Sequence, residues 1–90
     1  MPQAIVDPEE LRRFAQSLNK FNKDVQERIT SLSGQLASLE RTWRDQEQKK
    51  FAEEFQQQIQ VLTRFLEMVD THVPYLLRKA DIIEEYLQQR

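Results

Sequence analysis

The chain has 90 residues, of which 39% are hydrophobic and 31% charged, and its formal net charge is −2. This length allows one domain, and a chain this short buries only about 60–65% of its unfolded surface. The composition is too apolar for a disordered chain and too polar for a thick self-contained core. Because the chain has no cysteine to form disulfides, we expect a partner chain to supply the missing core.

The patterns of charge and hydropathy argue against nucleic-acid binding, a cleaved signal peptide and a membrane span. Basic residues occur in isolated pairs flanked by acids, such as Lys49-Lys50, whereas nucleic-acid binding requires clustered cations. The segment MPQAIVDPEE has no basic start and no long apolar stretch, so no cleaved signal peptide is expected. The most apolar window, VLTRFLEMV, is interrupted by Arg64 and Glu67 and is too short to span a bilayer.

The segment VDPEEL predicts the start of a first helix. Asp7 suits the N-cap, Pro8 suits the first helical position, and Glu10 completes a capping box. Apolar residues then recur every three or four positions, which predicts a helix over residues 7–41 behind an N-terminal arm, 1–6. This apolar series is Leu11, Phe14, Leu18, Phe21, Val25, Ile29, Leu32, Leu36, Leu39 and Trp43.

A second helix is predicted over residues 46–90, after a turn at 42–45. Thr42 and Asp45 both suit its N-cap. Its main apolar series has the spacing of a coiled-coil seam from Ile59 onward, and a second line runs beside it. With the second line, the apolar surface covers roughly 160° of the helix, more than one neighbouring helix can cover. The main series is Phe51, Phe55, Ile59, Leu62, Leu66, Val69, Val73, Leu76, Ala80, Ile83 and Leu87, and the second is Val61, Phe65, Met68, His72, Tyr75, Lys79, Ile82 and Tyr86.

Two residues are able to interrupt these helices. Gly34 falls on the outer face of the first helix, where we predict a tolerated weak point, with a loop at residues 33 and 34 as the alternative. Pro74 falls on the polar face of the second helix and leaves the apolar spacing in phase, so we predict a kinked continuous helix.

Two long helices joined by a short turn fold back on each other. We therefore predict an all-α protein with a single domain, 1–90, that forms an antiparallel two-helix hairpin. Because the apolar surface of the second helix is too wide for one hairpin, two hairpins are expected to form a four-helix bundle, as a homodimer or with a paralogous hairpin. The residues expected at this dimer interface are Leu66, Met68, Val69, Val73, Leu76 and Ile83.

The tryptophan in the central segment TWRD, placed at the bend of such a hairpin, resembles the Trp-x-Gly turn of the WXG family. The segment FAEEF, which opens the second helix, adds to the likeness. These are the small ESAT-type proteins associated with type VII (ESX-type) secretion in bacteria. The resemblance implies dimeric helical hairpins without enzymatic activity, secreted without a cleaved signal peptide through a membrane ATPase of the FtsK/SpoIIIE type.

The chain departs from the family pattern at two places. Asp45 occupies the glycine position of the turn motif, giving Trp43-Arg44-Asp45; aspartate tolerates a left-handed turn better than most residues and also caps a helix. The family's tail signal, Tyr-x-x-x-Asp/Glu, is matched here by Tyr86 and Arg90, which carries the opposite charge.

The residue inventory argues against catalysis. The chain has one histidine, no cysteine and no glycine-rich loop that would hold a phosphate. His72 fits a packing or interface role better than a ligand role, and a di-iron bundle would require Glu-x-x-His pairs, whereas position 69 is Val. We expect no enzymatic activity, no metal and no cofactor.

Two functions fit these features. One is a secreted type VII substrate, or a carrier for a larger effector; the other is a cytoplasmic structural or adaptor dimer within a larger assembly. Trp43 is interpreted either as a lid on the open end of the hairpin or, with Arg44 and Asp45, as a recognition motif for a secretion ATPase or effector. In an antiparallel dimer this motif would lie beside the Tyr86 and Arg90 end of the other chain.

Overall fold

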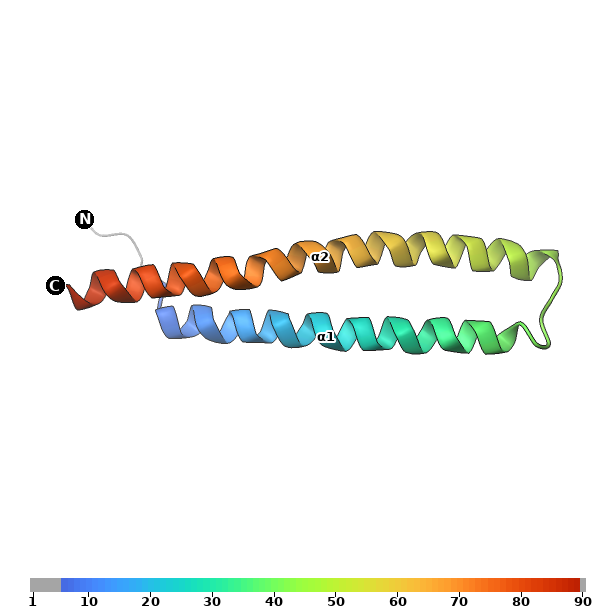
Figure 1. The fold of residues 1–90 in the computed structure, drawn as a ribbon, viewed down its shortest axis with the longest axis horizontal. Coiled ribbons are helices and arrows are strands. Elements are labelled where there is room, and N and C mark those ends of the chain that lie inside the picture. Colours follow the sequence, from blue (N-terminus) through green and yellow to red (C-terminus); the bar gives the residue numbers. More distant parts are fainter. Residues whose placement is uncertain (1–5, 90) are drawn as a thin grey trace.

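Two long antiparallel helices joined by one short loop form the protein, in a computed structural model that describes residues 6–89 (Figure 1). α1 spans Pro8–Leu39 and α2 spans Gln46–Gln88. The molecule measures 68 × 20 × 16 Å, so its core consists of the seam between the two helices. The all-α hairpin predicted from the sequence is confirmed.

α1 begins at its capping aspartate and ends earlier than predicted. The Asp7 carboxylate accepts a hydrogen bond of 2.9 Å from the backbone N–H of Glu9. The helix ends at Leu39 rather than near residue 41. Its last turn tightens because the N–H groups of Arg41 and Thr42 bond carbonyls only three residues back, at 3.2 and 3.1 Å. Such bonds satisfy carbonyls that the end of a helix otherwise leaves free.

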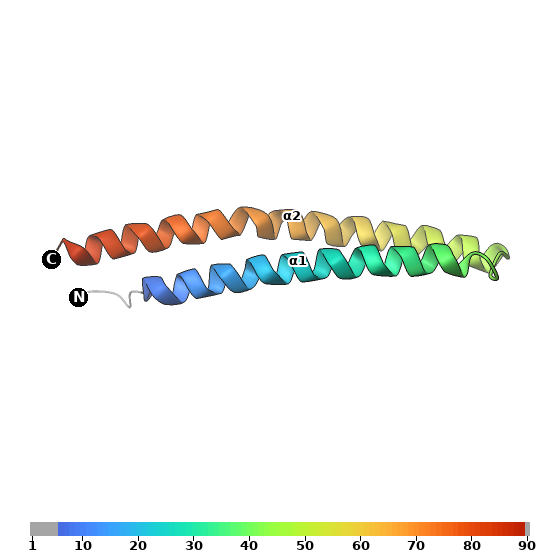
Figure 2. The same cartoon turned by 60° about the horizontal axis from the view of Figure 1, so that its bottom comes forward.

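Gly34 and Pro74 both lie inside unbroken helices. α1 continues through Gly34, so the alternative of a loop at 33 and 34 does not occur. α2 continues through Pro74 and is drawn in Figure 2 as one gently curved ribbon. Proline lacks an N–H group, which leaves the Asp70 carbonyl without its usual helical donor. Both Asp70 and Pro74 are exposed, so water can form a hydrogen bond with the Asp70 carbonyl.

The seam uses only part of the line predicted for α1. On α2 the inner line follows the predicted series, and Leu66, Val69 and Ala80 are its buried members. On α1, Leu36 of the predicted series is buried, but Ala15 and Asn22 are buried too, and four of the large apolar residues predicted for the inner face are exposed. Those four are Phe14, Phe21, Leu32 and Leu39. The short side chains at 15 and 22 let the helices approach closely, and the larger neighbours turn outward.

Asn22 places a polar contact in the middle of the apolar seam. It is 1% exposed, and its amide nitrogen donates to the Leu66 carbonyl and to the Asp70 carboxylate, both at 2.8 Å. The Asn22 side-chain oxygen accepts a 2.6 Å hydrogen bond from the Gln26 amide. A buried asparagine of this kind fixes the register of paired helices, because any sliding leaves its amide unsatisfied. Asn22 therefore fixes how α2 lies along α1.

A cluster of charges joins the helices near their free ends. Arg12 forms ion pairs with Glu9 at 3.1 Å and Asp81 at 2.8 Å, and it also pairs with Glu84. Hydrogen bonds to Asp81 and Glu84 raise the pKa of Arg12 above its ordinary value. The guanidinium therefore stays charged at any accessible pH, and the cluster holds the start of α1 against the end of α2.

The two broad sides of the hairpin differ in chemistry. The Asn22–Asp70 and Arg12–Glu84 contacts lie on one side, together with exposed polar residues such as Asn19 and Gln56. On the other side, which we call the apolar face, eleven large apolar side chains from both helices are exposed. They are Phe14, Phe21, Leu32 and Leu39 of α1 and Phe51, Val61, Phe65, Met68, Tyr75, Ile82 and Tyr86 of α2.

Replacing Asn22 with alanine should lower the free energy of unfolding by about 1–3 kcal/mol, because it removes buried hydrogen bonds and leaves a gap in the seam. Urea denaturation followed by circular dichroism measures this change. Asn19→Ala is the matched control, since Asn19 is exposed on the same helix, and it should cost less than about 0.5 kcal/mol. Equal losses in the two variants would show that the Asn22 contacts do not stabilise the hairpin.

Gly34→Ala should raise the free energy of unfolding by about 0.5–1 kcal/mol, the usual gain from replacing a helical glycine. A Cβ atom at Gly34 meets no atom within 4 Å, and its φ is not positive, so alanine fits without strain. Thermal unfolding followed by circular dichroism measures the gain. A lower melting temperature would indicate that another chain occupies the space beside Gly34 in solution.

Candidate functional site

The side chains of two of the three motif residues form hydrogen bonds that close the bend between the helices. Asp45 caps α2: its carboxylate accepts a 2.9 Å bond from the Gln48 N–H, which decides between the two predicted caps. Arg44 turns back toward α1, where its Nε donates to the Glu40 carbonyl at 3.2 Å. The backbone of Asp45 is extended, with φ −84° and ψ −174°. The position that glycine holds in the Trp-x-Gly pattern therefore needs no left-handed residue here.

Trp43 starts a row of three aromatic rings that leads away from the bend. Its N–H bonds the Leu39 carbonyl at 3.0 Å, and its ring lies 5.9 Å from that of Phe51 at an interplanar angle of 39°. Phe51 in turn stacks on Phe55 at 5.8 Å. Aromatic pairs at these separations attract each other beyond their buried area. Trp43 is only half-buried, so part of the indole remains available for contact.

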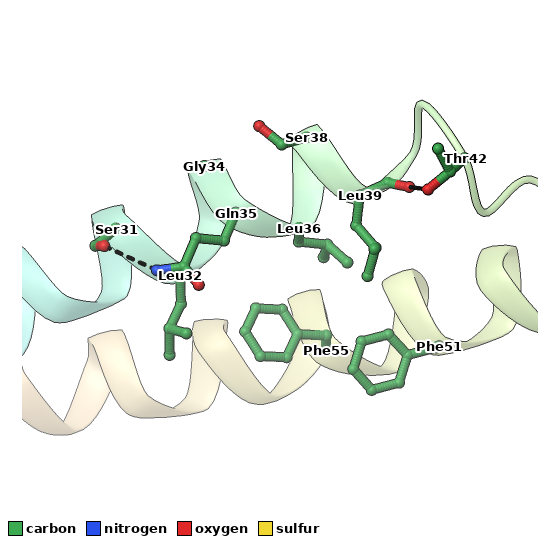
Figure 3. A pocket seen from close by; sticks show the side chains of 10 residues that line it. All are labelled: Ser31, Leu32, Gly34, Gln35, Leu36, Ser38, Leu39, Thr42, Phe51 and Phe55. Carbon is green, nitrogen blue, oxygen red and sulfur yellow. Dashed lines mark hydrogen bonds between the residues drawn. The ribbon is translucent and has the colours of Figure 1, made fainter.

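A groove opens on the apolar face next to this row. It has a volume of about 740 Å³ and lies between the last two turns of α1 and the first three turns of α2. In Figure 3, Leu32 and Leu39 point from α1 toward Phe51 and Phe55 of α2, and Ser31 and Ser38 lie along its upper edge. The groove is apolar at its base and is open to solvent along its length.

A second hollow of about 410 Å³ lies farther along the same face. Phe14 of α1 and Phe65 and Tyr75 of α2 are among the residues that line it, and His72 lies at its edge. His72 is exposed among apolar neighbours. The apolar face is thus not flat, since two hollows alternate with projecting side chains.

The structure divides the six residues predicted for the dimer interface. Leu66 and Val69 are buried against α1 within the same chain, so they are not available to a partner. Val73, Leu76 and Ile83 are half-buried in the same seam. Met68 alone projects from the apolar face, with 61% of its surface exposed. The outward line on α1 was missed because its phenylalanines and leucines were assigned to the inner face.

The tail candidate lies far from the bend within one chain. Tyr86 is exposed in the last turn of α2, at the opposite end of the hairpin from Trp43 (Figure 1). Arg90 lies outside the described residues. A single hairpin therefore does not bring the turn motif and the tail together.

Within residues 6–89 no group of three acidic or histidine side chains is placed to hold a metal ion. In the same part of the chain, neither helix is apolar enough over its length to cross a bilayer. The surface features that distinguish this hairpin are therefore the bend and the apolar face.

Comparison with known proteins agrees with the Trp-centred hairpin. The family model WXG100, described as proteins of 100 residues with WXG, matches residues 3–86. The chain belongs to this family. Its match covers both helices and the bend, and position 45 of this member carries aspartate in place of the motif glycine.

Relatives of this WXG100 protein are small secreted proteins of the ESAT-6 and EsxB type. An ESAT-6-like protein of Streptococcus agalactiae, SAG1039, is 29% identical over 85 residues, which cover 94% of this chain and 88% of that protein. The crystal structure of the secreted protein EsxB from Bacillus anthracis is 30% identical, with a TM-score of 0.80 over 96% of this chain and 98% of that chain. A point variant of EsxB reaches a TM-score of 0.83 over 94% of this chain and 96% of that chain.

Asp45→Ala should lower the free energy of unfolding by about 0.5–2 kcal/mol. Asp45→Gly should lower it by only a few tenths of a kcal/mol, because glycine also serves as an N-cap. Asp45→Asn is the matched control that keeps the side-chain acceptor, and it should behave like the wild type. Urea denaturation of the three variants measures the order. A glycine variant as unstable as the alanine variant would contradict the view that capping is the main role of Asp45 in the fold.

Proposed function

We propose that this protein is a non-enzymatic substrate of type VII secretion that leaves the cell as a homodimeric four-helix bundle. Membership in the WXG100 family and the secreted relatives support this proposal. The observation that carries it for this chain is the bend, where Trp43 is only half-buried and Arg44 and Asp45 are fixed by hydrogen bonds. An ordered motif of this kind suits recognition by a membrane ATPase of the FtsK/SpoIIIE type or by a larger effector.

The apolar face supports the dimer. Its eleven large side chains are each about half exposed. Such side chains carry about 150–250 Å² each, so roughly 900 Å² of apolar surface faces solvent in one hairpin. That area is near the ~800 Å² per partner of a standard interface and exceeds the apolar patch that a monomer usually exposes. A second copy of this hairpin covers it in a way that leaves the bend free.

The bend is available to a further partner in this arrangement. Trp43, Arg44 and Asp45 lie at the tip of the hairpin, beyond the end of the helix seam (Figure 1). In an antiparallel dimer the tip of one copy lies near Tyr86 of the other. The dimer would then present two equivalent composite ends, each suited to contact with an ATPase or an effector.

Trp43→Ala should reduce export to about a tenth of the wild-type level, the loss expected when a central aromatic of a recognition site is truncated. Export is measured as the fraction of protein in the culture medium of a bacterium with a type VII system, at matched folded levels. Leu77→Ala is the control, because Leu77 is an exposed apolar residue of α2 outside the bend and the apolar face. It should leave export unchanged.

Equal export of wild type and Trp43→Ala would reduce Trp43 to a structural lid. No export of the wild type in such a host would favour the second candidate, a structural or adaptor dimer inside the cell. Circular dichroism of each variant separates loss of recognition from loss of folding, since truncation of a half-buried aromatic at the tip leaves both helices intact.

A further inference from the structure

Two parallel rows of side chains run along α2 on the apolar face. One row has Phe51, Gln58, Phe65, His72, Lys79 and Tyr86, and the other has Glu54, Val61, Met68, Tyr75 and Ile82; successive members of each row are seven residues apart. The first row alternates aromatic and polar residues over most of its length, and the second is mostly apolar. Glu47 extends the second row by one heptad at the start of α2. Apart from His72, the other charged residues are Lys79 in the first row, near the end of α2, and Glu54 in the second row, near its start, and their charges are opposite. Both side chains are exposed.

We propose that the second copy lies antiparallel on this face with a two-fold axis that crosses α2 between Leu66 and Glu67. This inference rests on the homodimer of the proposed function and specifies its register. With the axis at this position, antiparallel packing of α2 on its own copy brings each row against the other row of the partner. Two-fold symmetry forms each of these contacts twice. Phe65 then faces the partner's Met68 at the centre, and Lys79 faces the partner's Glu54 toward each end.

This register is the one that uses the whole length of the helices. The axis lies at the midpoint of α2, which spans Gln46–Gln88, so neither copy overhangs the other. It brings Phe51 against the partner's Ile82, and both are exposed apolar residues. A shift of seven residues one way places Lys79 against the partner's Val61. The opposite shift places Met68 against the partner's Gln58 and leaves Ile82 beyond the start of the partner's helix.

The exposed residues of α1 fit the same axis. The hydrogen bonds of Asn22 place it level with Leu66 and Asp70, so the axis crosses α1 close to Lys23. About that point Phe14 faces the partner's Leu32. Phe14 and Leu32 are both exposed on the apolar face, and on the chain itself neither has a place in the seam. The two helices thus agree on one position for the axis.

The groove and the projecting side chains of the apolar face determine which ends of the two copies lie together. The groove of about 740 Å³ lies at the bend end of the face, whereas Ile82 and Tyr86 project from the other end, with 62% and 58% of their surfaces exposed. Copies with their bends at the same end would face groove to groove and projection to projection. Copies with their bends at opposite ends place Ile82 over the groove beside the partner's Phe51, and so fill the space seen in Figure 3.

Charge reversal on the full chain tests the register. Lys79→Glu and Glu54→Lys should each weaken dimerisation about tenfold at low salt, because each variant turns two attractive pairs per dimer into repulsive ones. The double variant, with both reversals, should restore the dimer dissociation constant to within about threefold of wild type, since the pairs form again with their signs exchanged. Sedimentation equilibrium at about 20 mM and about 500 mM salt measures the constants, because this roughly 25-fold increase in ionic strength screens the ion pairs.

Glu47→Lys is the matched control, because Glu47 lies one heptad before Glu54 in the same row and is exposed. It should leave the dissociation constant unchanged and should not compensate Lys79→Glu. If Glu47→Lys restored the dimer of Lys79→Glu, Lys79 would face residue 47 of the partner and the proposed register would be wrong. If Glu10→Lys restored it, Lys79 would face α1 of the partner and the proposed orientation would be wrong. If the wild type is a dimer and the single reversals do not change its dissociation constant, the proposed register is wrong but the dimer itself is supported. A wild type that is monomeric at micromolar concentration overturns both.

Discussion

The hydrogen bonds of Asn22 to α2 determine where every other residue of the hairpin lies. An amide in the centre of an apolar seam leaves one favourable alignment of the helices, because sliding by a turn would strand it without partners. The alignment decides that Arg12 reaches Asp81 and Glu84 at the free ends and that Trp43 meets Phe51 at the bend. It also decides which flank remains polar and which becomes the apolar face.

The chemical difference between the flanks has a simple origin. In the described part of the chain, the polar side-chain contacts between the helices form on one side, where Asn22 donates to Asp70 and Arg12 pairs with Asp81 and Glu84. On the other side the large apolar residues of both helices remain about half exposed in the described part of the chain. A hairpin built this way has one face whose polar groups are paired within the chain and another face that leaves apolar surface exposed. Its small core and its exposed surface are therefore two consequences of the same alignment.

The spacing of apolar residues predicted both helices and their antiparallel packing, and it identified the inner line of α2. It identified the inner line of α1 only in part, because two overlapping lines with similar spacing run along that helix: Leu36 is buried, whereas Phe14 and Phe21 face outward. Size favoured the line with Phe14 and Phe21, but close approach of the helices requires the short side chains of Ala15 and Asn22. Sequence spacing shows that a helix has an apolar side and does not show which of two neighbouring lines the partner covers.

Cross-helix contacts in the hairpin join residues that are farther apart in sequence the farther they lie from the bend. Asn22 contacts a residue 44 positions away, and Arg12 contacts one 69 positions away, whereas Trp43 meets Phe51 across the loop itself. The entropy lost in closing a chain segment grows with its length. We expect the hairpin to close from the bend toward its free ends and to fray in the reverse order, a gradient that amide hydrogen exchange would report. A machine that pulls on the free ends would then meet the least resistance first, and the bend would be the last part to open.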